Sequence, residues 1–194
     1  MTVRAISFRA RAASVGALFA ASCVFSPAFG QNNIFDAPVM APFVPTPELV
    51  VSHMLETAKL TPEDKLYDLG SGDGRILFAA AEEYGASAVG IEISEVLVTK
   101  TRERAEQLGL AEKVEVRRQN LLEADLSDAT VVTVYLLSSS NEQLRPKLEK
   151  ELKPGTRVIS HDFQFEGWTP KQTVEVDGGG RPHHIYLYEI AAGE

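Results

Sequence analysis

The chain has 194 residues, of which 44% are hydrophobic and 24% are charged, and its formal net charge is −8. This length is enough for one globular domain and too short for two ordinary ones. The acidic balance argues against a nucleic-acid partner, because phosphate binding needs a basic face. It suits a basic protein or a small molecule as substrate.

Residues 1–30 have the features of a leader segment. Arginines but no acids precede a small, apolar run, which is too short to span a bilayer as a stable helix. Ala28 and Gly30 form a small-x-small cleavage pattern, which predicts a signal peptide and an exported or periplasmic protein. Two alternatives stay open: a mitochondrial transit peptide, or a cytoplasmic protein whose translation starts at Met40.

Thiol and metal chemistry are not indicated. The only cysteine, Cys23, lies within the leader. The four histidines form no HxxxH or HExxH pair, so no metal is expected. The next segment, residues 31–45, is rich in Pro, Asn and Ala and predicts an extended linker. Thr46 is the predicted N-cap of a helix with Pro47 at its first position.

The stretch YDLGSGDGR, from Tyr67 to Arg75, lies between a short apolar run and a helix-forming run that should end at Gly85. Strand, glycine-rich turn and helix are the layout of a nucleotide-binding βα unit. A dinucleotide would place its pyrophosphate on the helix N-terminus, where Asp68 and Asp73 would repel it. A ligand with a sulfonium and an ammonium group is tolerated, which points to S-adenosylmethionine (SAM). The predicted contacts are Asp68 just before this turn and, within it, Gly70, Ser71, Gly72, Asp73 and Gly74.

Residues 87–93 predict the next strand, which carries Glu92 at its end. An acid about 20 residues after the glycine-rich turn can accept both ribose hydroxyls. Glu92 and its neighbour Ile93 are therefore further predicted cofactor contacts. Ser94 is the predicted N-cap of the following helix.

From about Phe43 to Ile190 the chain resembles a class I, seven-strand SAM-dependent methyltransferase. The residues FVPTP from Phe43, DLGSGDGR from Asp68 and GIEI from Gly90 are together similar to a narrower family. This is the family of the mitochondrial lysine methyltransferase of the ATP synthase c-subunit, with its bacterial relatives. The DLGSG residues also resemble those of non-SET histone lysine methyltransferases.

The resemblance implies a Rossmann-like, doubly wound α/β fold with a mostly parallel seven-stranded sheet. Residues 46–194 would form the methyltransferase domain, and residues 31–45 a linker and lid, with Thr46 at the SAM pocket. Asn120, just past the third strand, would face the adenine, with Leu121 beside it; a turn-capping Asn120 is the alternative.

The second half of the chain predicts the rest of this sheet. Residues 129–137 are nearly all β-branched or apolar, as in a strand buried on both faces. Pro146 is expected to split the polar helical stretch that follows into two helices. Residues 173–176 and 184–190 alternate in polarity around a glycine turn and predict a C-terminal antiparallel hairpin.

Tyr135 is the candidate catalytic residue, because open α/β sheets bind ligands at the carboxyl ends of their strands. It is predicted to orient an acceptor amine; a tyrosine at the core edge is the alternative. His161 and Asp162, at the next strand end, are candidate lining residues of the acceptor site. Trp168 is a candidate wall of the acceptor channel, although an aromatic side chain that covers the core edge is the favoured interpretation. Arg75 is expected to pair with a nearby acid rather than to contact the substrate.

Methyl transfer from a sulfonium is a direct displacement, so the enzyme mainly aligns the acceptor. A lysine acceptor must first lose a proton, and with a pKa near 10.4 only about one in a few thousand is neutral at pH 7. Desolvation lowers that pKa, so no strong general base is required. The predicted function is SAM-dependent methylation of a protein lysine by a monomer. A small-molecule methyltransferase, a nucleotide-dependent oxidoreductase and a silent SAM-binding scaffold are the alternatives.

Overall fold

The computed structural model describes Thr2 and residues 39–192. The predicted leader, apart from Thr2, and the first part of the predicted linker lie outside the described residues. None of the helices in the described part of the chain has the length and hydropathy needed to cross a bilayer.

Seven strands form one sheet in the order β3-β2-β1-β4-β5-β7-β6. The pairs within β1 to β5 are parallel, whereas β7 runs antiparallel to both β5 and β6. This confirms the predicted mostly parallel sheet with a C-terminal antiparallel hairpin. The strands are β1 (Lys65–Leu69), β2 (Ser87–Glu92), β3 (Val114–Arg118), β4 (Val131–Val134), β5 (Arg157–His161), β6 (Gln172–Asp177) and β7 (Pro182–Glu189).

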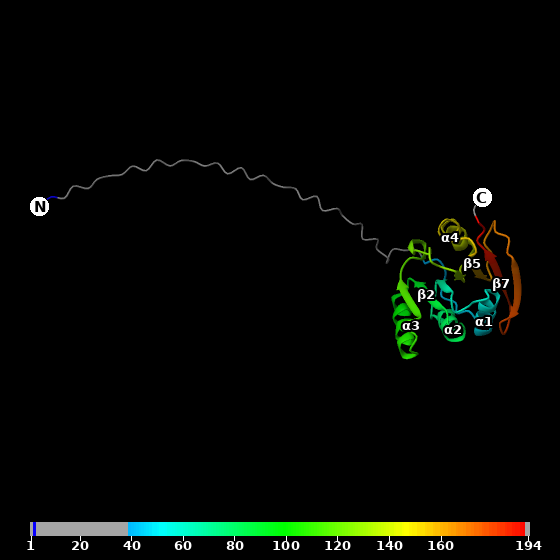
Figure 1. Ribbon diagram of the computed structural model, residues 1–194, viewed down its shortest axis with the longest axis horizontal. Helices are drawn as coiled ribbons and strands as arrows, with labels where there is room; N and C mark the ends of the chain where they lie inside the picture. The colour runs from blue at the N-terminus through cyan, green and yellow to red at the C-terminus, as the bar shows by residue number, and fades with distance from the viewer. Residues whose placement is uncertain (1, 3–38, 193–194) are drawn as a thin grey trace. The chain divides into compact units, whose positions relative to one another are not determined.

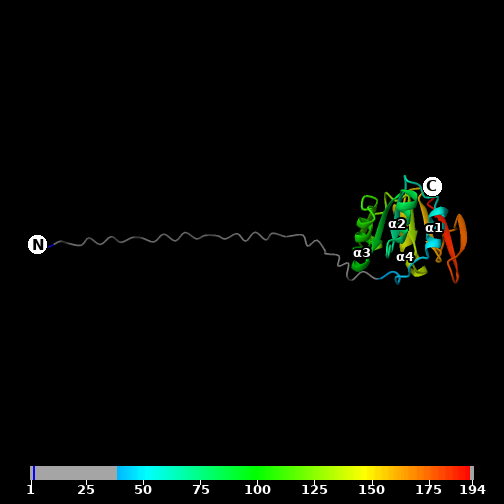
Figure 2. The same cartoon turned by 90° about the horizontal axis from the view of Figure 1, so that it is seen from below.

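Helices cover both faces of the sheet, as Figures 1 and 2 show. On one face pack α1 (Glu48–Thr57), α2 (Arg75–Tyr84) and α3 (Glu95–Gln107), and on the other packs α4 (Ser138–Glu151). Each face has its own apolar core: Leu66 of β1 packs with α1 and α2, and the next residue, Tyr67, packs on the side of α4. This doubly wound arrangement explains why β1 and β4 are buried along most or all of their length.

Several predicted boundaries agree with the structure. The helix after the glycine-rich turn ends where expected, because Gly85 takes a left-handed conformation with φ +72° and closes it. The Ser94 hydroxyl accepts a hydrogen bond from the Leu97 N–H at 3.4 Å, which makes it the predicted N-cap of α3.

Three predicted details are wrong. Helix α1 begins at Glu48, and Thr46 makes no capping bond because its hydroxyl instead lies 3.2 Å from Nδ1 of His161. Helix α4 is continuous through Pro146, which lies on the solvent side, where water can satisfy the carbonyl that proline leaves unbonded. Strand β4 is shorter than predicted and stops at Val134, before Tyr135.

Candidate functional site

A cavity of about 270 Å³ opens at the carboxyl ends of β1, β2 and β4. Its wall contains Tyr135 and every predicted cofactor residue except Gly74. Gly74 instead begins α2 with φ +76°, and a Cβ there would collide with the Thr101 side chain, so its glycine is required for packing. The other predicted residues in the wall are Thr46, Asp68, Gly70, Ser71, Gly72, Asp73, Glu92, Ile93, Asn120 and Leu121.

The glycine-rich turn is fixed to the neighbouring strand through its backbone. The N–H groups of Gly70 and Ser71 both donate to the carbonyl of Ile91, at 2.8 and 3.1 Å. Gly70 and Gly72 have φ angles of +89° and +55°, in the region that favours glycine. The turn therefore presents bare backbone to the cavity.

The Glu92 side chain binds this turn through a hydrogen bond from the backbone of the turn. Its Oε2 accepts the Gly72 N–H at 2.9 Å and its Oε1 accepts the Ser94 N–H at 2.8 Å. The residue is only 9% exposed, so its carboxylate is held rigidly at the end of β2. Each oxygen still has a lone pair with which it can accept another hydrogen bond.

Asp68 is a buried acid at the end of β1. Burial raises its pKa to about 7, against a hydrogen bond that its carboxylate accepts from the Thr133 hydroxyl at 2.8 Å; the nearby charges of Glu92 and Asp73 raise it further. In the same cavity wall, the buried Ser71 hydroxyl has no hydrogen-bond partner within the described part of the chain. These two groups leave unused polar capacity at the cavity wall.

Arg75 pairs with an acid, as predicted from the sequence. Its guanidinium lies 2.6 Å from Oδ2 of Asp73, and this hydrogen bond is the main reason that the pKa of Asp73 is lowered. The same guanidinium donates to the carbonyl of Thr46 at 2.6 Å. Arg75 therefore joins the glycine-rich turn to the segment that precedes α1.

That segment, residues 39–46, forms a strap along the cavity, and all eight of its residues are in the wall. The ring of Phe43 lies over Gly72, where a Cβ would stand 2.5 Å from the ring. The carbonyl of Met40 accepts a hydrogen bond from the Ser140 hydroxyl. The sequence predicted a lid here but only Thr46 as a contact, because an extended segment without periodicity gives no signal for individual residues.

Two of the other candidates have structural partners. The amide oxygen of Asn120 accepts the Leu122 N–H at 3.1 Å, the turn-capping alternative, although the residue also lines the cavity. Trp168 is not in the cavity wall; its indole N–H donates to Glu149 at 2.8 Å and its ring packs against Phe165. It covers the edge of the core.

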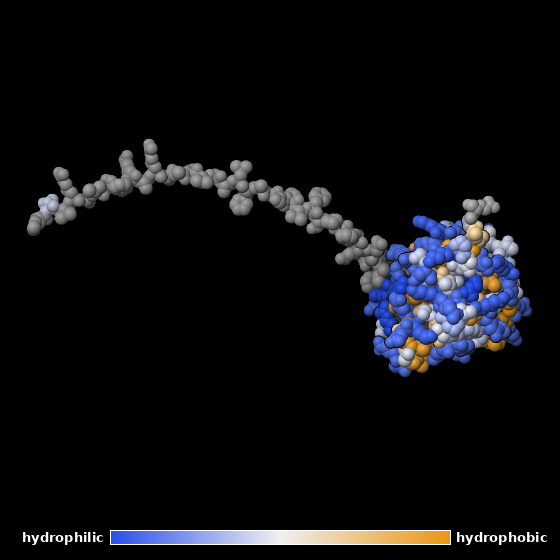
Figure 3. Space-filling model, viewed as in Figure 1, coloured by the Kyte–Doolittle hydropathy of each residue, from blue (hydrophilic) through white to orange (hydrophobic). Residues whose placement is uncertain are grey.

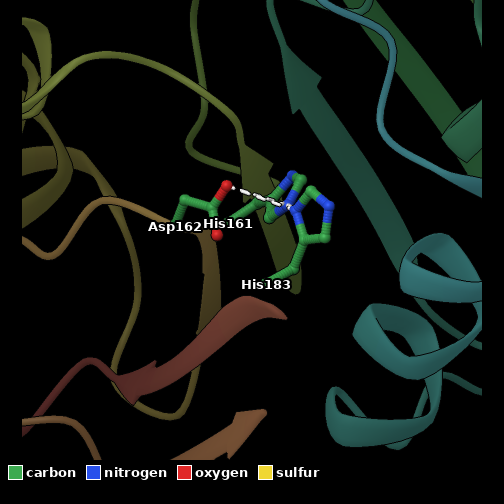
Figure 4. A group of neighbouring side chains, drawn as sticks. All are labelled: His161, Asp162 and His183. Atoms are coloured by element: carbon green, nitrogen blue, oxygen red, sulfur yellow. Dashed lines mark hydrogen bonds and ion pairs between the residues drawn. The ribbon is translucent and has the colours of Figure 1, made fainter. Parts of the chain in front are cut away.

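Tyr135 lies in the cavity wall and also contacts a cluster of polar side chains. Figure 4 shows three members of this cluster, His161, Asp162 and His183. The ring of Tyr135 lies 3.8 Å from the ring of His161, centre to centre, and its hydroxyl donates to Oδ2 of Asp162 at 3.4 Å. His183, from the start of β7, places Nδ1 2.8 Å from Nε2 of His161 and 3.3 Å from the same Asp162 oxygen. Sequence reasoning missed His183, because only the antiparallel return of β7 brings it beside β5.

The charge states of this cluster follow from burial. Burial lowers the pKa of His161 to about 4, so its ring is neutral at pH 7. Burial opposes ionisation of Asp162, but hydrogen bonds from Arg181 and the His184 N–H outweigh it and lower its pKa to about 2. The cluster is a carboxylate beside neutral imidazole.

These three side chains also have the atom types of a metal site. One donor atom from each of His161, Asp162 and His183 lies within 4.8 Å of the others. The same atoms are already joined to one another by hydrogen bonds. The expectation from the sequence that the protein binds no metal stays a prediction.

The comparisons with known proteins identify the family. A sequence model of the ANTKMT methyltransferase domain matches residues 68–172, more than half of the chain. The chain belongs to this family. It is 49% identical over 150 residues to the protein-lysine N-methyltransferase of Saccharolobus islandicus, a match that spans 77% of this chain and 93% of the relative.

A further relative and a solved structure extend the comparison. The ATP synthase c-subunit lysine N-methyltransferase of Mus musculus is 36% identical over 79% of this chain, which spans 60% of the length of that relative. The crystal structure of an RNA methyltransferase from Salinibacter ruber in complex with S-adenosyl-L-homocysteine is 50% identical, with a TM-score of 0.74 over 78% of this chain and 96% of the other. The predicted class I methyltransferase fold is confirmed, as is SAM as the methyl donor of the family.

The predicted localisation is wrong. The similarity to the Saccharolobus islandicus enzyme extends over 93% of that enzyme, and it gives no support to an export signal. The prediction of an exported or periplasmic protein is therefore contradicted by the comparisons.

Proposed function

We propose that this protein transfers a methyl group from SAM to the side-chain amine of a lysine in a protein acceptor. The observation that supports this most directly is the cavity at the carboxyl ends of β1, β2 and β4, with the Asp68 and Glu92 carboxylates in its wall. The lysine acceptor is inferred from the relatives, since the Saccharolobus islandicus protein is a protein-lysine N-methyltransferase.

The residues at the cavity fit SAM by their chemistry. Glu92 has lone pairs left for two ribose hydroxyls after accepting the Gly72 and Ser94 N–H groups. The buried Asp68 carboxylate would gain a counter-charge from the ligand's ammonium, and the Ser71 hydroxyl would gain a partner. Gly70 and Gly72 let the ligand lie against the backbone.

When bound, SAM supplies a methyl group on a sulfonium sulfur; the acceptor nitrogen's lone pair forms the new N–C bond while the S–C electron pair stays on sulfur. The protein's part is to align the amine and to exclude water. Tyr135 is the proposed orienting residue, because it lies in the cavity wall at the end of β4. Its ring is fixed by the ring of His161, at 3.8 Å.

RNA is a second candidate acceptor, because the Salinibacter ruber neighbour is described as an RNA methyltransferase at 50% identity. The charge of this chain, −8, disfavours a polyanion and favours a lysine-bearing protein. Hydrophilic residues cover most of the face of the molecule in Figure 3. We also propose that the strap, residues 39–46, covers the SAM site; it combines the described part of the predicted linker and lid, residues 31–45, with Thr46, the first residue of the predicted domain of residues 46–194.

The test is a transfer assay with the full chain and tritium-labelled SAM. Poly-L-lysine and isolated ATP synthase c-subunit serve as protein acceptors, and total RNA as the competing acceptor. We expect label in the proteins, recovered as methyl-lysine after acid hydrolysis. Label that enters RNA alone, or none in any acceptor although S-adenosyl-L-homocysteine binds, would contradict the proposed function.

A further inference from the structure

A cation lies against Tyr135, the cavity-wall residue that is proposed to orient the acceptor amine. Arg181, in the turn before β7, donates from Nη2 to Oδ2 of Asp162 at 2.5 Å and to the Tyr135 hydroxyl at 3.3 Å. The Arg181 side chain is 54% exposed, whereas Asp162 is 10% exposed. A largely solvated cation therefore occupies a seat formed by a partly buried carboxylate and a hydroxyl.

The seat is rigid on the side away from Arg181. The His184 N–H donates to Oδ1 of Asp162 at 3.0 Å, and a ring nitrogen of His183 lies 3.3 Å from Oδ2, as Figure 4 shows for the ring. Asp162 has a φ of +60°, which is unusual for a residue with a Cβ. Strain of this kind persists where the surrounding structure enforces it, often at functional sites.

The seat is continuous with the proposed SAM site. Tyr135 lines the cavity and also contacts both Asp162 and Arg181 through its hydroxyl. We infer that Asp162 and Tyr135 bind the acceptor's amine, and that Arg181 holds this seat until the acceptor displaces it. The inference rests on the proposed function and names the residues that recognise its substrate.

The exchange of Arg181 for the acceptor lysine leaves the charge at Asp162 unchanged, because one cation with N–H donors replaces another. Arg181 is exposed, so leaving Asp162 for water loses little, since ion pairs with a solvated partner contribute little. A partly buried carboxylate without a cation would be unfavourable, so a lysine that takes the place of Arg181 restores the pairing that its departure removes.

Asp162 would also assist the transfer itself. The amine gives its proton to solvent before it attacks, and positive charge returns to the nitrogen as the new bond forms. A fixed carboxylate stabilises that developing charge. N–H groups donated to Asp162 and Tyr135 would leave the nitrogen lone pair free to face the methyl group.

Arg181 has an ordinary alternative role as a structural counter-ion of Asp162. The two roles predict opposite effects of Arg181→Gln. If Arg181 competes with the acceptor amine for Asp162, its removal lowers the acceptor KM. If Arg181 is a structural counter-ion, its removal loosens the seat, which raises KM and lowers kcat.

The experiment measures steady-state methylation of poly-L-lysine and of isolated ATP synthase c-subunit by the full chain. The variants are Arg181→Gln, Asp162→Asn and the control Lys171→Gln, which removes another exposed cation, paired with Glu189 at 2.8 Å. We expect Arg181→Gln to lower the acceptor KM by about two- to fivefold without lowering kcat. Asp162→Asn should lower kcat/KM by about 10- to 100-fold, and Lys171→Gln should change neither.

Affinity for S-adenosyl-L-homocysteine is measured for each variant and should stay within about twofold of wild type, which shows that a variant is folded. A raised KM in Arg181→Gln, or an unchanged kcat/KM in Asp162→Asn, overturns the inference while leaving the proposed function intact. If Asp162→Asn fails to fold, the Arg181→Gln result alone decides. A wild-type protein that methylates RNA but neither protein acceptor overturns the proposed function first.

Discussion

The Oε2 atom of Glu92 accepts a hydrogen bond from the backbone N–H of Gly72 at 2.9 Å. This bond joins the end of β2 to the glycine-rich turn after β1, within the buried part of the site. The acid proposed to hold the ribose therefore also fixes the turn proposed to lie under the ligand. Ligand binding and turn geometry should be lost together.

Replacing Glu92 by glutamine tests this double role. The new amide keeps the shape but has only one acceptor oxygen, so one of the Gly72 and Ser94 N–H groups would face an N–H₂ group. We expect the Kd for S-adenosyl-L-homocysteine, measured by calorimetry, to rise at least about tenfold. The control is Glu103→Gln on the exposed face of α3, which should bind like wild type. Equal affinity in both variants would contradict the assignment of Glu92.

Gly72 should tolerate alanine less well than a glycine with the same backbone but open surroundings. A Cβ at Gly72 would lie 2.5 Å from the Phe43 ring, and the φ of +55° adds strain. Gly109 has a φ of +69° and nothing within 4 Å of a Cβ, so Gly109→Ala measures the strain alone. In urea unfolding, Gly72→Ala should lose about 1 kcal/mol more stability than Gly109→Ala.

A double-mutant cycle identifies the source of that extra loss. Phe43→Ala removes the ring, so the penalty for Gly72→Ala should shrink by at least about 0.5 kcal/mol in the Phe43→Ala background. If the penalty is the same in both backgrounds, the strap does not press on the turn in solution.

The sequence was most informative where a site is made by neighbours along the chain. Asp68 lies at the end of β1 and Gly70 and Gly72 in the turn that follows, so their positions follow from local backbone rules, and the structure places all three at one cavity. Glu92 follows from the next strand, because parallel neighbours end at the same edge of a sheet.

The cluster around Asp162 was only partly predictable, for a physical reason. Tyr135 and Asp162 directly follow the ends of the neighbouring parallel strands β4 and β5, and the sequence marks both as candidates. His183 and Arg181 reach them only because β7 runs back beside β5, a long-range register that no local pattern encodes. The predicted break at Pro146 is wrong because helix propensity takes no account of which side of a helix faces water.

The buried acid Asp68 should make stability depend on pH. Its pKa of about 7 lies above the unfolded value of 3.8, so the native state binds more protons than the unfolded state between these values. The stability from Asp68 is complete below pH 3.8 and declines as pH rises to about 7. His161 acts in the opposite direction, because its native pKa of about 4 lies below 6.5. A comparison with a variant is therefore needed.

The Asp68→Asn variant mimics the protonated acid at every pH. Its stability relative to wild type should increase by about 3 kcal/mol between pH 5 and pH 8. Urea unfolding at the two pH values measures this, and Glu82→Gln on the exposed side of α2 controls for loss of a surface charge. A difference that is independent of pH would show that Asp68 is already ionised in the native protein at pH 5.

Tyr135→Phe tests the residue that joins the cavity to the Asp162 cluster. Burial and the charge of Asp162 raise the pKa of Tyr135, so its hydroxyl is neutral at pH 7 and can both donate and accept. Removing it leaves the ring against His161 but takes one hydrogen bond from the amine seat. We expect kcat with poly-L-lysine to fall about tenfold, while the affinity for S-adenosyl-L-homocysteine stays within about twofold.

Tyr84→Phe is the matched control, since Tyr84 lies at the end of α2, outside the cavity wall, and should leave kcat unchanged. A Tyr135→Phe enzyme that keeps wild-type kcat would assign Tyr135 to the core edge. A variant that instead loses affinity for S-adenosyl-L-homocysteine would place the hydroxyl on the cofactor side. Only a loss confined to kcat, or to the acceptor KM, fits a tyrosine that orients the acceptor amine.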